Sequence, residues 1–367
     1  MKNFLTKMSL FIIIASYNLF AQISEKHQID SSLFYIDLFN TSMNNNADCY
    51  RIPSLITAPN GDLIAAIDER IESCGDLHQN KDINIVIKRS SDNGKTWSDI
   101  ERIVDFPFGE SASDPSMIVD AITNEIFLFY NFMDLEKEPR TYYLHVIKSC
   151  DNGKTWSKPI DITSQITLPE WKKDFKFITS GHGIQTKSGK LLHTIVNLNN
   201  GLHVFGSDDH GKNWYLINAP ITPGDESKII ELSDGKWMIN SRVNKNGYRF
   251  VHISNNDGQT WETYKDSILI DPACNASLLN YKYEENGIAK SCLLFSNAKH
   301  STERKNMTIS ISFDEGKTWS KEKLIYSGSS AYSTLTILQN GDIGLFFEKD
   351  EYTKNVFVKI PFDYLIN

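Results

Sequence analysis

The sequence predicts an all-β fold, a six-bladed β-propeller, and three observations indicate it. A short turn motif, Ser-x-Asp-x-Gly-Lys-Thr-Trp in its commonest form, occurs five times at a period near 50 residues, which is typical of propellers and repeat arrays. A β-like segment precedes each copy, and each of these segments has an earlier β-like partner. The chain shows no long helical periodicity and no linker that would divide it into separate domains.

The repeated motif has a physical explanation as a hairpin turn. Asp and Asn side chains accept hydrogen bonds from nearby backbone amides, and Gly adopts a positive φ. In the fourth copy Asn256 replaces the acid, which a structural staple tolerates better than a catalytic group would. We therefore interpret these acids as structural, rather than as calcium ligands or catalysts. The copies begin at Ser90, Ser149, Ser207, Ser254 and Ser312, which lie 47 to 59 residues apart.

Paired β-like segments lead to the count of six blades. The segments before the five turns are 82–90, 141–149, 202–207, 248–254 and 306–312. Their earlier partners are 63–68, 125–132, 190–196, 236–243 and 291–297. A sixth pair, 343–349 and 355–361, lacks the turn motif. Segment 33–39 is expected to complete the last blade and close the ring, because closure removes an exposed sheet edge.

Composition excludes several classes of protein. The 367 residues are 40% apolar and 23% charged, which excludes a disordered chain. The formal net charge of −8 makes the chain a poor partner for nucleic acid or an anionic membrane surface.

The N-terminus is predicted to be a cleaved signal peptide, residues 1–21. Lys2 and Lys7 come before or at the start of an apolar run at 8–20, and Ala21 offers a small residue at the cut. The run is shorter than the roughly 20 residues that span a bilayer. We expect a secreted or periplasmic protein with no membrane span, in which residues 22–367 form a single propeller domain.

Export permits disulfides, and the chain has five cysteines. Cys49 with Cys74, or Cys274 with Cys292, are the possible bridges, and free buried thiols are the alternative. An odd number leaves at least one cysteine unpaired within the chain. No CxxC or His-rich spacing indicates zinc, so no metal is expected.

The segment Arg51-Ile52-Pro53, followed by the repeated turns, resembles the bacterial sialidase (neuraminidase) family. Members of that family combine an Arg-Ile-Pro motif with repeated "Asp boxes" on a six-bladed propeller. The resemblance extends to about Glu348. It implies a monomeric exo-α-sialidase without a cofactor, which releases terminal sialic acid from glycoproteins, glycolipids or oligosaccharides with retention of configuration.

The resemblance also implies a carboxylate-binding set of three arginines, Arg51, Arg242 and Arg304. A guanidinium fork pairs with a carboxylate in two parallel hydrogen bonds and keeps its charge, so the residue type suits the task. Glu348 resembles the family glutamate that steadies the first arginine. Arg70 matches another family arginine, near the acid and the N-acyl group of the sugar.

Tyr332 matches the family nucleophile, and Glu226 matches its base. Sialic acid carries a carboxylate beside the anomeric carbon, so a neutral phenol avoids the repulsion that an anionic nucleophile would meet. The phenol needs a base, because its reference pKa is about 10. Glu226 to Arg242 and Tyr332 to Glu348 both span 16 residues, each linking a loop to the end of the following strand. Glu231 is the second choice of base, since its surroundings read as strand.

Asp76 is the expected proton donor, six residues after Arg70 in a turn that contains Gly75. Asp82 is the alternative, but it begins the next strand.

Two other reaction classes stay open on this sequence. In trans-sialylation a sugar oxygen replaces water as the acceptor, and in a binding propeller sialic acid is held without cleavage.

Three further residues resemble family positions but receive no catalytic assignment. His182 and Gln185 lie in a segment that resembles a loop facing the site, where His182 is equally well a loop residue without a role. Met117 is a candidate for the lining of an acyl pocket.

Overall fold

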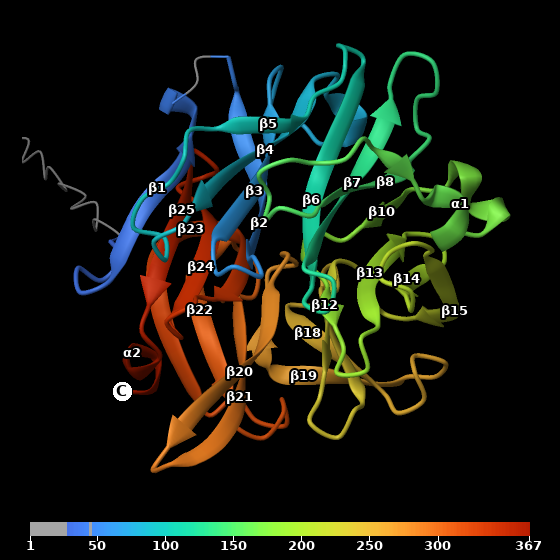
Figure 1. The fold of residues 1–367 in the computed structure, drawn as a ribbon. Coiled ribbons are helices and arrows are strands. Elements are labelled where there is room, and N and C mark those ends of the chain that lie inside the picture. Colours follow the sequence, from blue (N-terminus) through green and yellow to red (C-terminus); the bar gives the residue numbers. More distant parts are fainter. Residues whose placement is uncertain (1–27, 44–45) are drawn as a thin grey trace, which may run out of the picture.

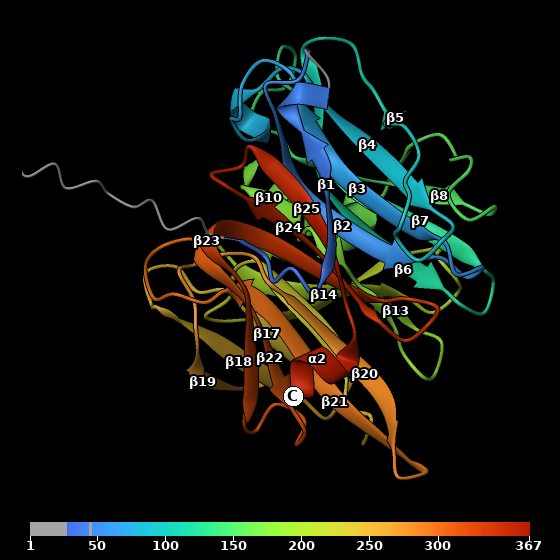
Figure 2. The same cartoon turned by 90° about the vertical axis from the view of Figure 1, so that its left-hand side faces the viewer.

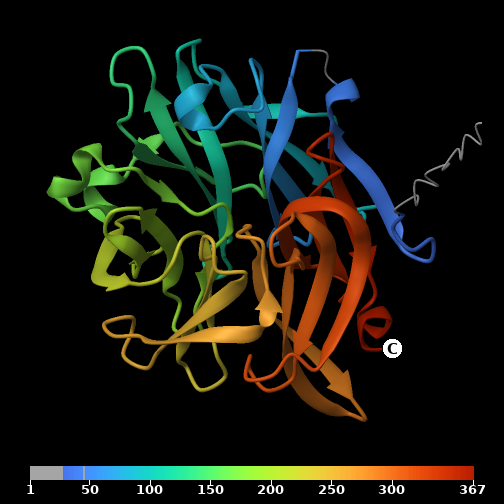
Figure 3. The same cartoon turned by 180° about the vertical axis from the view of Figure 1, so that it is seen from behind.

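The structure is a computed structural model that describes residues 28–43 and 46–367. The predicted signal peptide, 1–21, lies outside the described residues. These form five β-sheets, and short helices such as α1 (Thr163–Ile166) and α2 (Phe362–Ile366) connect or end them. Figures 1 and 3 show the sheets set around a common centre in sequence order, from blue through green and orange to red. The all-β class and the propeller arrangement are therefore confirmed.

Four sheets are built mainly from consecutive strands. The first contains β2 (Cys49–Thr57), β3 (Leu63–Arg70), β4 (Ile83–Ser90) and β5 (Glu101–Val104). The second contains β6 (Glu110–Asp120), β7 (Glu125–Asp134), β8 (Tyr143–Ser149) and β9 (Ile160–Asp161), with β11 (Gly181–His182) parallel to β6. The third contains β10 (Lys176–Ile178), β12 (Ile184–Gln185), β13 (Leu191–Asn197), β14 (Gly201–Ser207) and β15 (Tyr215–Ile221). The fourth contains β16 (Ser227–Glu231), β17 (Trp237–Ser241), β18 (Tyr248–Ser254) and β19 (Glu262–Ile270).

The fifth sheet has seven strands, so the described residues form five sheets and not the six separate ones that we expected. The cause is the length of β23, which pairs with β22 through residues 321–329 and with β24 through residues 330–337. The order is β1 (Phe34–Asn40), β25 (Lys354–Ile360), β24 (Ile343–Lys349), β23 (Lys321–Ile337), β22 (Lys305–Ser312), β21 (Ile288–Ala298) and β20 (Ser277–Glu285).

The expected closing strand is confirmed. β1 pairs antiparallel with β25, from Phe34 opposite Lys359 to Asn40 opposite Lys354. Figure 2 shows the blue β1 alongside the red β25 and β24. An N-terminal strand therefore completes a sheet made by C-terminal strands, which covers an edge that would otherwise be open.

The sheets pack face to face, which explains why their strands read as nearly continuous apolar runs. On β4, Ile85 and Ile87 pack in a core shared with the second sheet. Val86, which points to the opposite face, packs in a core that contains Phe346 and Phe357 of the seven-stranded sheet. A strand that is buried on both faces favours β-branched residues at every position, not at alternate ones.

The repeated motif forms the hairpin staple that its residues predict. The Ser90 hydroxyl accepts a hydrogen bond from the amide of Gly94 at 2.9 Å, and Asp92 accepts from the amide of Thr96 at 2.9 Å and from its hydroxyl at 2.7 Å. The Trp97 indole donates to the Gly94 carbonyl at 3.0 Å. The hydrogen bonds to Asp92 lower its pKa to about 2. The bond from the amide of Thr96 has the largest effect, and the bond from the Thr96 hydroxyl has the next largest.

The fourth copy makes the same contacts without a charge. Asn256 accepts from the amide of Thr260 at 3.0 Å and donates to its hydroxyl at 2.8 Å.

The motif requires glycine at its fifth position for two reasons, a positive φ and a lack of space for a side chain. Gly94 has φ +80°, and a Cβ on it would lie 2.3 Å from the Phe357 ring. The structural interpretation of the motif is confirmed.

Candidate active site

A cavity of about 330 Å³ lies at one end of the inner strands, within the size range of small-molecule sites. Its walls come from loops and strand ends of all five sheets. The predicted residues among its lining are Arg51, Asp76, Glu226, Arg242, Arg304 and Tyr332. Side chains that are separated by up to 281 positions in the chain, from Arg51 to Tyr332, thus face one space.

Tyr332, on β23, lines the cavity, and its hydroxyl is hydrogen-bonded to Glu226. The hydroxyl donates to Glu226 Oε2 at 2.7 Å, and Arg242 Nη1 donates to the same oxygen at 2.5 Å and to the hydroxyl at 3.2 Å. Burial, and next the charge of Glu226, raise the pKa of Tyr332 well above its ordinary value. The phenol is therefore neutral at physiological pH, with a carboxylate in position to accept its proton.

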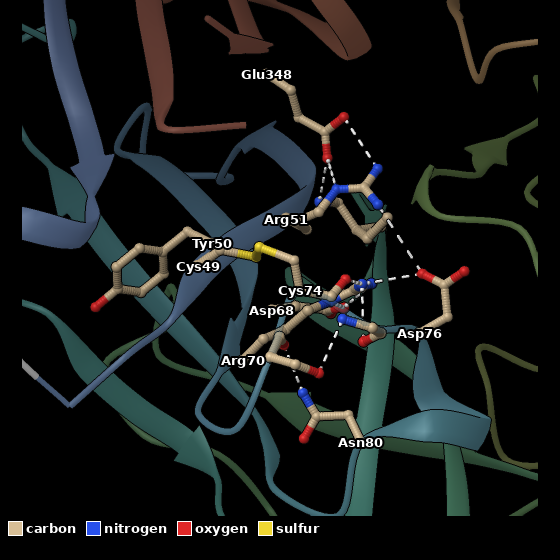
Figure 4. The surroundings of a disulfide bond; sticks show 12 residues. Cys49, Tyr50, Arg51, Asp68, Arg70, Cys74, Asp76, Asn80 and Glu348 are labelled. Carbon is tan, nitrogen blue, oxygen red and sulfur yellow. Dashed lines mark hydrogen bonds and ion pairs between the residues drawn. A yellow bond between two sulfur atoms is a disulfide. The ribbon is translucent and has the colours of Figure 1, made fainter. Parts of the chain in front are cut away.

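Glu348 joins Arg51 to the strand of Tyr332. It is 1% exposed and accepts hydrogen bonds from Arg51 Nε at 2.9 Å, Arg51 Nη2 at 3.2 Å, the amide of Ile52 at 2.9 Å and the amide of Tyr332 at 3.1 Å. Burial alone would lower the pKa of Arg51, but the charge of Glu348 and its hydrogen bonds raise it above the ordinary value. The predicted support of Arg51 by Glu348 is confirmed, and Figure 4 shows the fork.

The inner strands are irregular where they reach the cavity. The register of β2 against β3 shifts between Arg51 and Ser54, and Ile52 has φ 68°, a left-handed conformation that is strained for a β-branched residue. The same pattern recurs on β6, where the register shifts between Ser113 and Ser116 and Asp114 has φ 64°. Bulges of this kind re-aim side chains, and here they point Arg51 and Asp114 into the cavity.

Arg304 also lies close to the Tyr332 ring. Its Nη1 donates to the Tyr352 hydroxyl at 3.1 Å, and its guanidinium carbon lies 5.4 Å from the centre of the Tyr332 ring. The Arg51 guanidinium carbon lies 5.5 Å from the same ring and 4.1 Å from the ring of Tyr352. The structure therefore brings all three predicted arginines to one tyrosine. Tyr352, which packs between two of them, was not found from the sequence, because it lies in a hairpin turn without a motif.

Asp76 lies at the rim of the cavity, and its side chain is 65% exposed. It accepts from Arg70 Nη1 at 2.9 Å and lies 3.9 Å from Arg51 Nη1. Partial burial alone would raise the pKa of Asp76, but the charge and hydrogen bond of Arg70, and then the charge of Arg51, hold it below its ordinary value.

Arg70 lies next to the predicted acid, as expected, but it does not line the cavity. It is 0% exposed and lies behind Asp76, outside the lining of the cavity, with its donors engaged by Asp68, Asp76 and the carbonyls of Cys74 and Gly75. A contact of Arg70 with substrate stays a prediction, since Arg70 is not among the residues that line the cavity. Its surroundings give it a supporting contact to Asp76, because a fully buried guanidinium bonds the groups that enclose it.

The two alternatives that the sequence left open lie outside the cavity lining. Asp82 accepts a hydrogen bond from Asn84 at 3.2 Å at the entrance to β4. Glu231, at the end of β16, accepts from the amide of Lys187 at 2.7 Å. The geometry therefore favours Asp76 over Asp82 and Glu226 over Glu231.

One of the two possible disulfides is present, and it joins Cys49 to Cys74. Cys274 and Cys292 are free and buried, and Cys150 is free and exposed, so the alternative bridge is wrong.

Among the described residues, we find no cluster of three or more His, Cys, Asp or Glu side chains arranged to hold a metal ion, and no helix with the length and apolar character to cross a membrane.

His182, Gln185 and Met117 lie away from the candidate active site. They line a second cavity, of about 270 Å³, together with residues from the opposite ends of the inner strands. His182 Nε2 lies 3.1 Å from the Ser277 hydroxyl, and burial, together with the charge of Lys228, lowers the pKa of His182 to about 4. The alternative that His182 is a loop residue without a role in the active site therefore agrees with the structure, and neither Gln185 nor Met117 lines the candidate active site.

One wall of the active-site cavity is apolar and was not predicted. Phe175, Phe177 and Leu198 line it, and Phe175 packs edge-on against Tyr142 with ring centres 4.7 Å apart. Residues in this segment carry no motif, and Leu198 is 55% exposed, so only the tertiary structure reveals that they face the site.

Asp114 is a second residue of the cavity that the sequence left unassigned. Its carboxylate accepts from Asn131 Nδ2 at 3.0 Å, and its amide donates to Asp68 at 2.9 Å. Burial, and next the negative charge of Asp68, raise the pKa of Asp114 to about 8. The cavity therefore holds a carboxyl group that is neutral below that pH.

Replacing Asp114 with Asn should remove a pH dependence of stability. Because the pKa of Asp114 is higher in the folded state than its ordinary value of 3.8, its contribution is fully present below about pH 4 and is lost as the pH rises through 8. The free energy of unfolding of Asp114→Asn should therefore rise relative to wild type across this window, by at most about 1.4 kcal/mol per pH unit. Urea unfolding of both proteins at pH 5 and pH 8 measures this. A difference that stays constant with pH would contradict the assignment.

Comparison with known proteins identifies the family. The family model for the BNR repeat-like domain matches residues 61–345. A sialidase of Bacteroides fragilis (strain YCH46) is 33% identical over 333 residues, which are 83% of this chain and 60% of that protein. A sialidase of Micromonospora viridifaciens is 36% identical over 329 residues, 82% of this chain and 50% of that protein. The chain thus spans little more than half the length of these relatives.

Solved structures agree with the fold. The Hadza microbial sialidase Hz136 superimposes with a TM-score of 0.79 and 30% sequence identity, over 88% of this chain and 67% of that one. A leech intramolecular trans-sialidase, at 21% identity, has the same fold with a TM-score of 0.79 over 90% of this chain and 71% of its own. The chain therefore belongs to the BNR repeat-like domain family and, within it, to the group that includes the bacterial sialidases.

Proposed function

We propose that this protein is an exo-α-sialidase that hydrolyses terminal α-linked sialic acids with retention, through a tyrosyl–sialyl intermediate. The observation that carries the proposal is the contact of the neutral Tyr332 hydroxyl with Glu226, 2.7 Å apart, beside the three arginines in one cavity. The kinship with the bacterial sialidases supports it. Its substrates are sialylated glycoproteins, glycolipids and oligosaccharides.

Binding begins with the carboxylate of the sugar. Arg51 and Arg304 lie close to the Tyr332 ring and Arg242 donates to its hydroxyl, so a carboxylate held by the three lies next to the nucleophile. Arg51 uses Nε and Nη2 on Glu348, which directs its remaining nitrogen, Nη1, toward the cavity. A fixed guanidinium loses little freedom when it pairs with a carboxylate.

Cleavage needs a nucleophile and an acid. Glu226 accepts the phenolic proton as the Tyr332 oxygen attacks the anomeric carbon, while the Arg242 charge next to both oxygens stabilises the phenolate that develops. Asp76 protonates the departing glycosidic oxygen and then, as a base, activates the water that hydrolyses the intermediate. All steps use side chains of this chain, and the scheme requires no cofactor.

Substrate binding itself prepares Asp76 as an acid. In the free protein the charges of Arg70 and Arg51 counteract burial and hold its pKa low. A substrate carboxylate on Arg51 offsets part of that charge, and the sugar displaces water from the rim. Both changes raise the pKa of Asp76 and favour the protonated form that the reaction needs.

The proposal extends to architecture and export. We count the seven-stranded sheet as two blades joined through β23, because each half of β23 pairs with a different set of strands, and this gives a six-bladed ring. Residues 1–21 are proposed to be removed as a signal peptide, and 22–367 to act as a monomeric, secreted or periplasmic domain.

Product analysis by NMR tests the proposal. Wild-type protein mixed with 3'-sialyllactose should release the α-anomer of sialic acid first, with the β-anomer appearing later by mutarotation. Initial release of the β-anomer would contradict retention. An anhydro-sugar or a sialylated acceptor as the main product would indicate transfer instead of hydrolysis. Binding of the sugar without any turnover would refute the enzyme and favour a binding propeller.

Asp76→Ala should lower kcat/KM for 3'-sialyllactose by about 10²- to 10⁴-fold, the usual contribution of a general acid. Asp82→Ala is the matched control, since it removes a carboxylate of the same loop that lies outside the cavity lining. The acid assignment is wrong if Asp76→Ala stays fully active while Asp82→Ala is inactive.

A further inference from the structure

A disulfide lies directly beside the candidate proton donor. Asp76 is on the loop of residues 71–82, between β3 and β4. Cys74, two residues before Asp76, is bonded to Cys49 at the start of β2. Cys49 is in turn two residues before Arg51. One covalent bond therefore links the loop of the acid to the strand of the carboxylate-binding arginine, as Figure 4 shows.

Arg70 makes three hydrogen bonds with the part of this loop that carries Asp76. Arg70 Nη1 donates to the carbonyl of Cys74 at 2.8 Å, to the carbonyl of Gly75 at 3.1 Å and to Asp76 Oδ1 at 2.9 Å. Two of these acceptors are backbone oxygens, so their positions depend on where Cys74 is held. After Asp76 the chain is anchored again by Leu77, which is buried.

Two further hydrogen bonds restrain this segment: the amide of Gly75 donates to the Ser73 hydroxyl at 3.2 Å, and the amide of Gln79 donates to the Asp76 carbonyl at 2.8 Å. Cys74 and Asp76 are both exposed, while Cys49 and Arg70 are buried. An acid must come within about 2.6 to 3.2 Å of the oxygen that it protonates. A displacement of about 1 Å can cost on the order of 100-fold in rate, so the position of an exposed loop acid depends on what fixes its backbone.

We propose that Cys49 and Cys74 are positioning residues for the proton donor, and that their disulfide selectively supports protonation of the leaving group. The inference rests on the proposed sialidase activity. It assigns the disulfide to one step: the three arginines, Tyr332 and Glu226 are held by contacts of their own, whereas Asp76 is held through Arg70 and Cys74.

Two substrates with different leaving groups isolate that step. Lactose leaves from 3'-sialyllactose as a poor leaving group and needs a proton, whereas 4-nitrophenolate leaves from an aryl sialoside without one. In the double variant Cys49→Ala/Cys74→Ala, kcat/KM for 3'-sialyllactose should fall by about 10- to 100-fold. The value for 4-nitrophenyl sialoside should change by less than about threefold.

A double-mutant cycle with the acid identifies the route of the effect. In an Asp76→Ala background there is no donor left to position, so removal of the disulfide should cause no further loss on 3'-sialyllactose. Cys150→Ser is the matched control, because it removes an exposed thiol that takes part in no disulfide. Thermal melting of each variant accompanies the kinetics.

Reduction of the wild-type protein provides the same test without a substitution. A water-soluble phosphine attacks the exposed Cys74 sulfur and transfers two electrons. The disulfide takes up two protons to become two thiols, and the oxygen of water ends on the phosphine oxide. Lactose release should slow by the same factor as in the double variant, and it should recover after reoxidation. The Cys49→Ala/Cys74→Ala protein should not respond to the phosphine.

The outcomes separate this inference from the proposed function. Three outcomes would overturn the positioning role. Equal losses on both substrates would mean that the disulfide supports the whole site, and no loss on either would mean that it supports neither reaction. Unfolding of the reduced wild-type protein would mean that it supports the fold. A persistent loss in the Asp76→Ala background would overturn the route through Asp76. Absence of turnover by oxidised wild-type protein on both sialosides refutes the proposed function itself.

Discussion

Replacing Tyr332 with Phe is expected to lower kcat/KM for an α-sialoside by at least about 10³-fold while the protein stays folded. The substitution removes one oxygen and keeps the ring, whose centre lies 5.5 Å from the guanidinium carbon of Arg51 and 5.4 Å from that of Arg304. Without that oxygen no covalent intermediate can form. Glu226 also loses its proton donor but keeps Arg242, so its charge stays paired. The loss should therefore appear in kcat, with substrate binding largely retained.

Single-turnover kinetics and equilibrium binding of the sugar acid measure the two effects separately. Tyr281→Phe is the matched control, because its hydroxyl donates to the Gly341 carbonyl at 2.7 Å in a different part of the fold. It should cost about 1 kcal/mol of stability and little activity. A Tyr332→Phe protein that keeps wild-type kcat, or one that no longer binds the sugar acid, would count against a nucleophilic role.

Glu348→Ala is expected to have the largest effect on stability, a loss of about 3 to 5 kcal/mol in the free energy of unfolding. Glu348 is the acceptor for two nitrogens of Arg51 and for the amides of Ile52 and Tyr332. Its removal leaves a buried guanidinium and two backbone donors without their acceptor. The strained φ of Ile52, 68°, also loses the hydrogen bond that holds it, so Arg51 should turn out of the cavity.

Glu348→Gln should lose less stability, because an amide oxygen still accepts two of these hydrogen bonds. Denaturant unfolding of wild type, Glu348→Gln and Glu348→Ala measures whether their stabilities fall in that order. Glu101→Ala is the surface control. Its pair with Arg89 is 3.2 Å long and partly exposed, and such pairs contribute about 0 to 1 kcal/mol. If Glu348→Ala were as mild as Glu101→Ala, the four contacts of Glu348 would not support the site.

The propeller was predictable because its signals are local and repeated. The side chains of Ser90 and Asp92 accept hydrogen bonds from Gly94 and Thr96 within seven residues, and Gly94 shows why the motif admits no other residue at its position. The continuity of β23 was not predictable, since no sequence signal separates a strand that ends from one that bends into the next sheet. β23 therefore joins in one sheet the strands that we expected in two separate sheets.

The site was predictable where the residue type alone dictates a chemical task, as for Tyr332, Glu226 and the three arginines. The position of Arg70 near the acid was predictable, but a sequence does not distinguish a guanidinium that faces a cavity from one that is buried behind it. Asp114 reaches the cavity through a bulge with a positive φ, and Tyr352 reaches Arg304 from a hairpin turn. Both depend on backbone irregularities that periodicity cannot detect.

The pairing of β1 with β25 sets the timing of assembly. Phe34 of β1 lies opposite Lys359 of β25, so β1, which is synthesised early, cannot pair until β25 has been synthesised. At roughly 5 to 20 residues per second, translation alone imposes a delay on the order of tens of seconds. Until β25 has been made, β1 lacks the strand that covers its edge, and an unpaired strand edge favours self-association. Any factor that shields this edge during synthesis or transit should raise the yield of functional protein more than one that stabilises the finished ring.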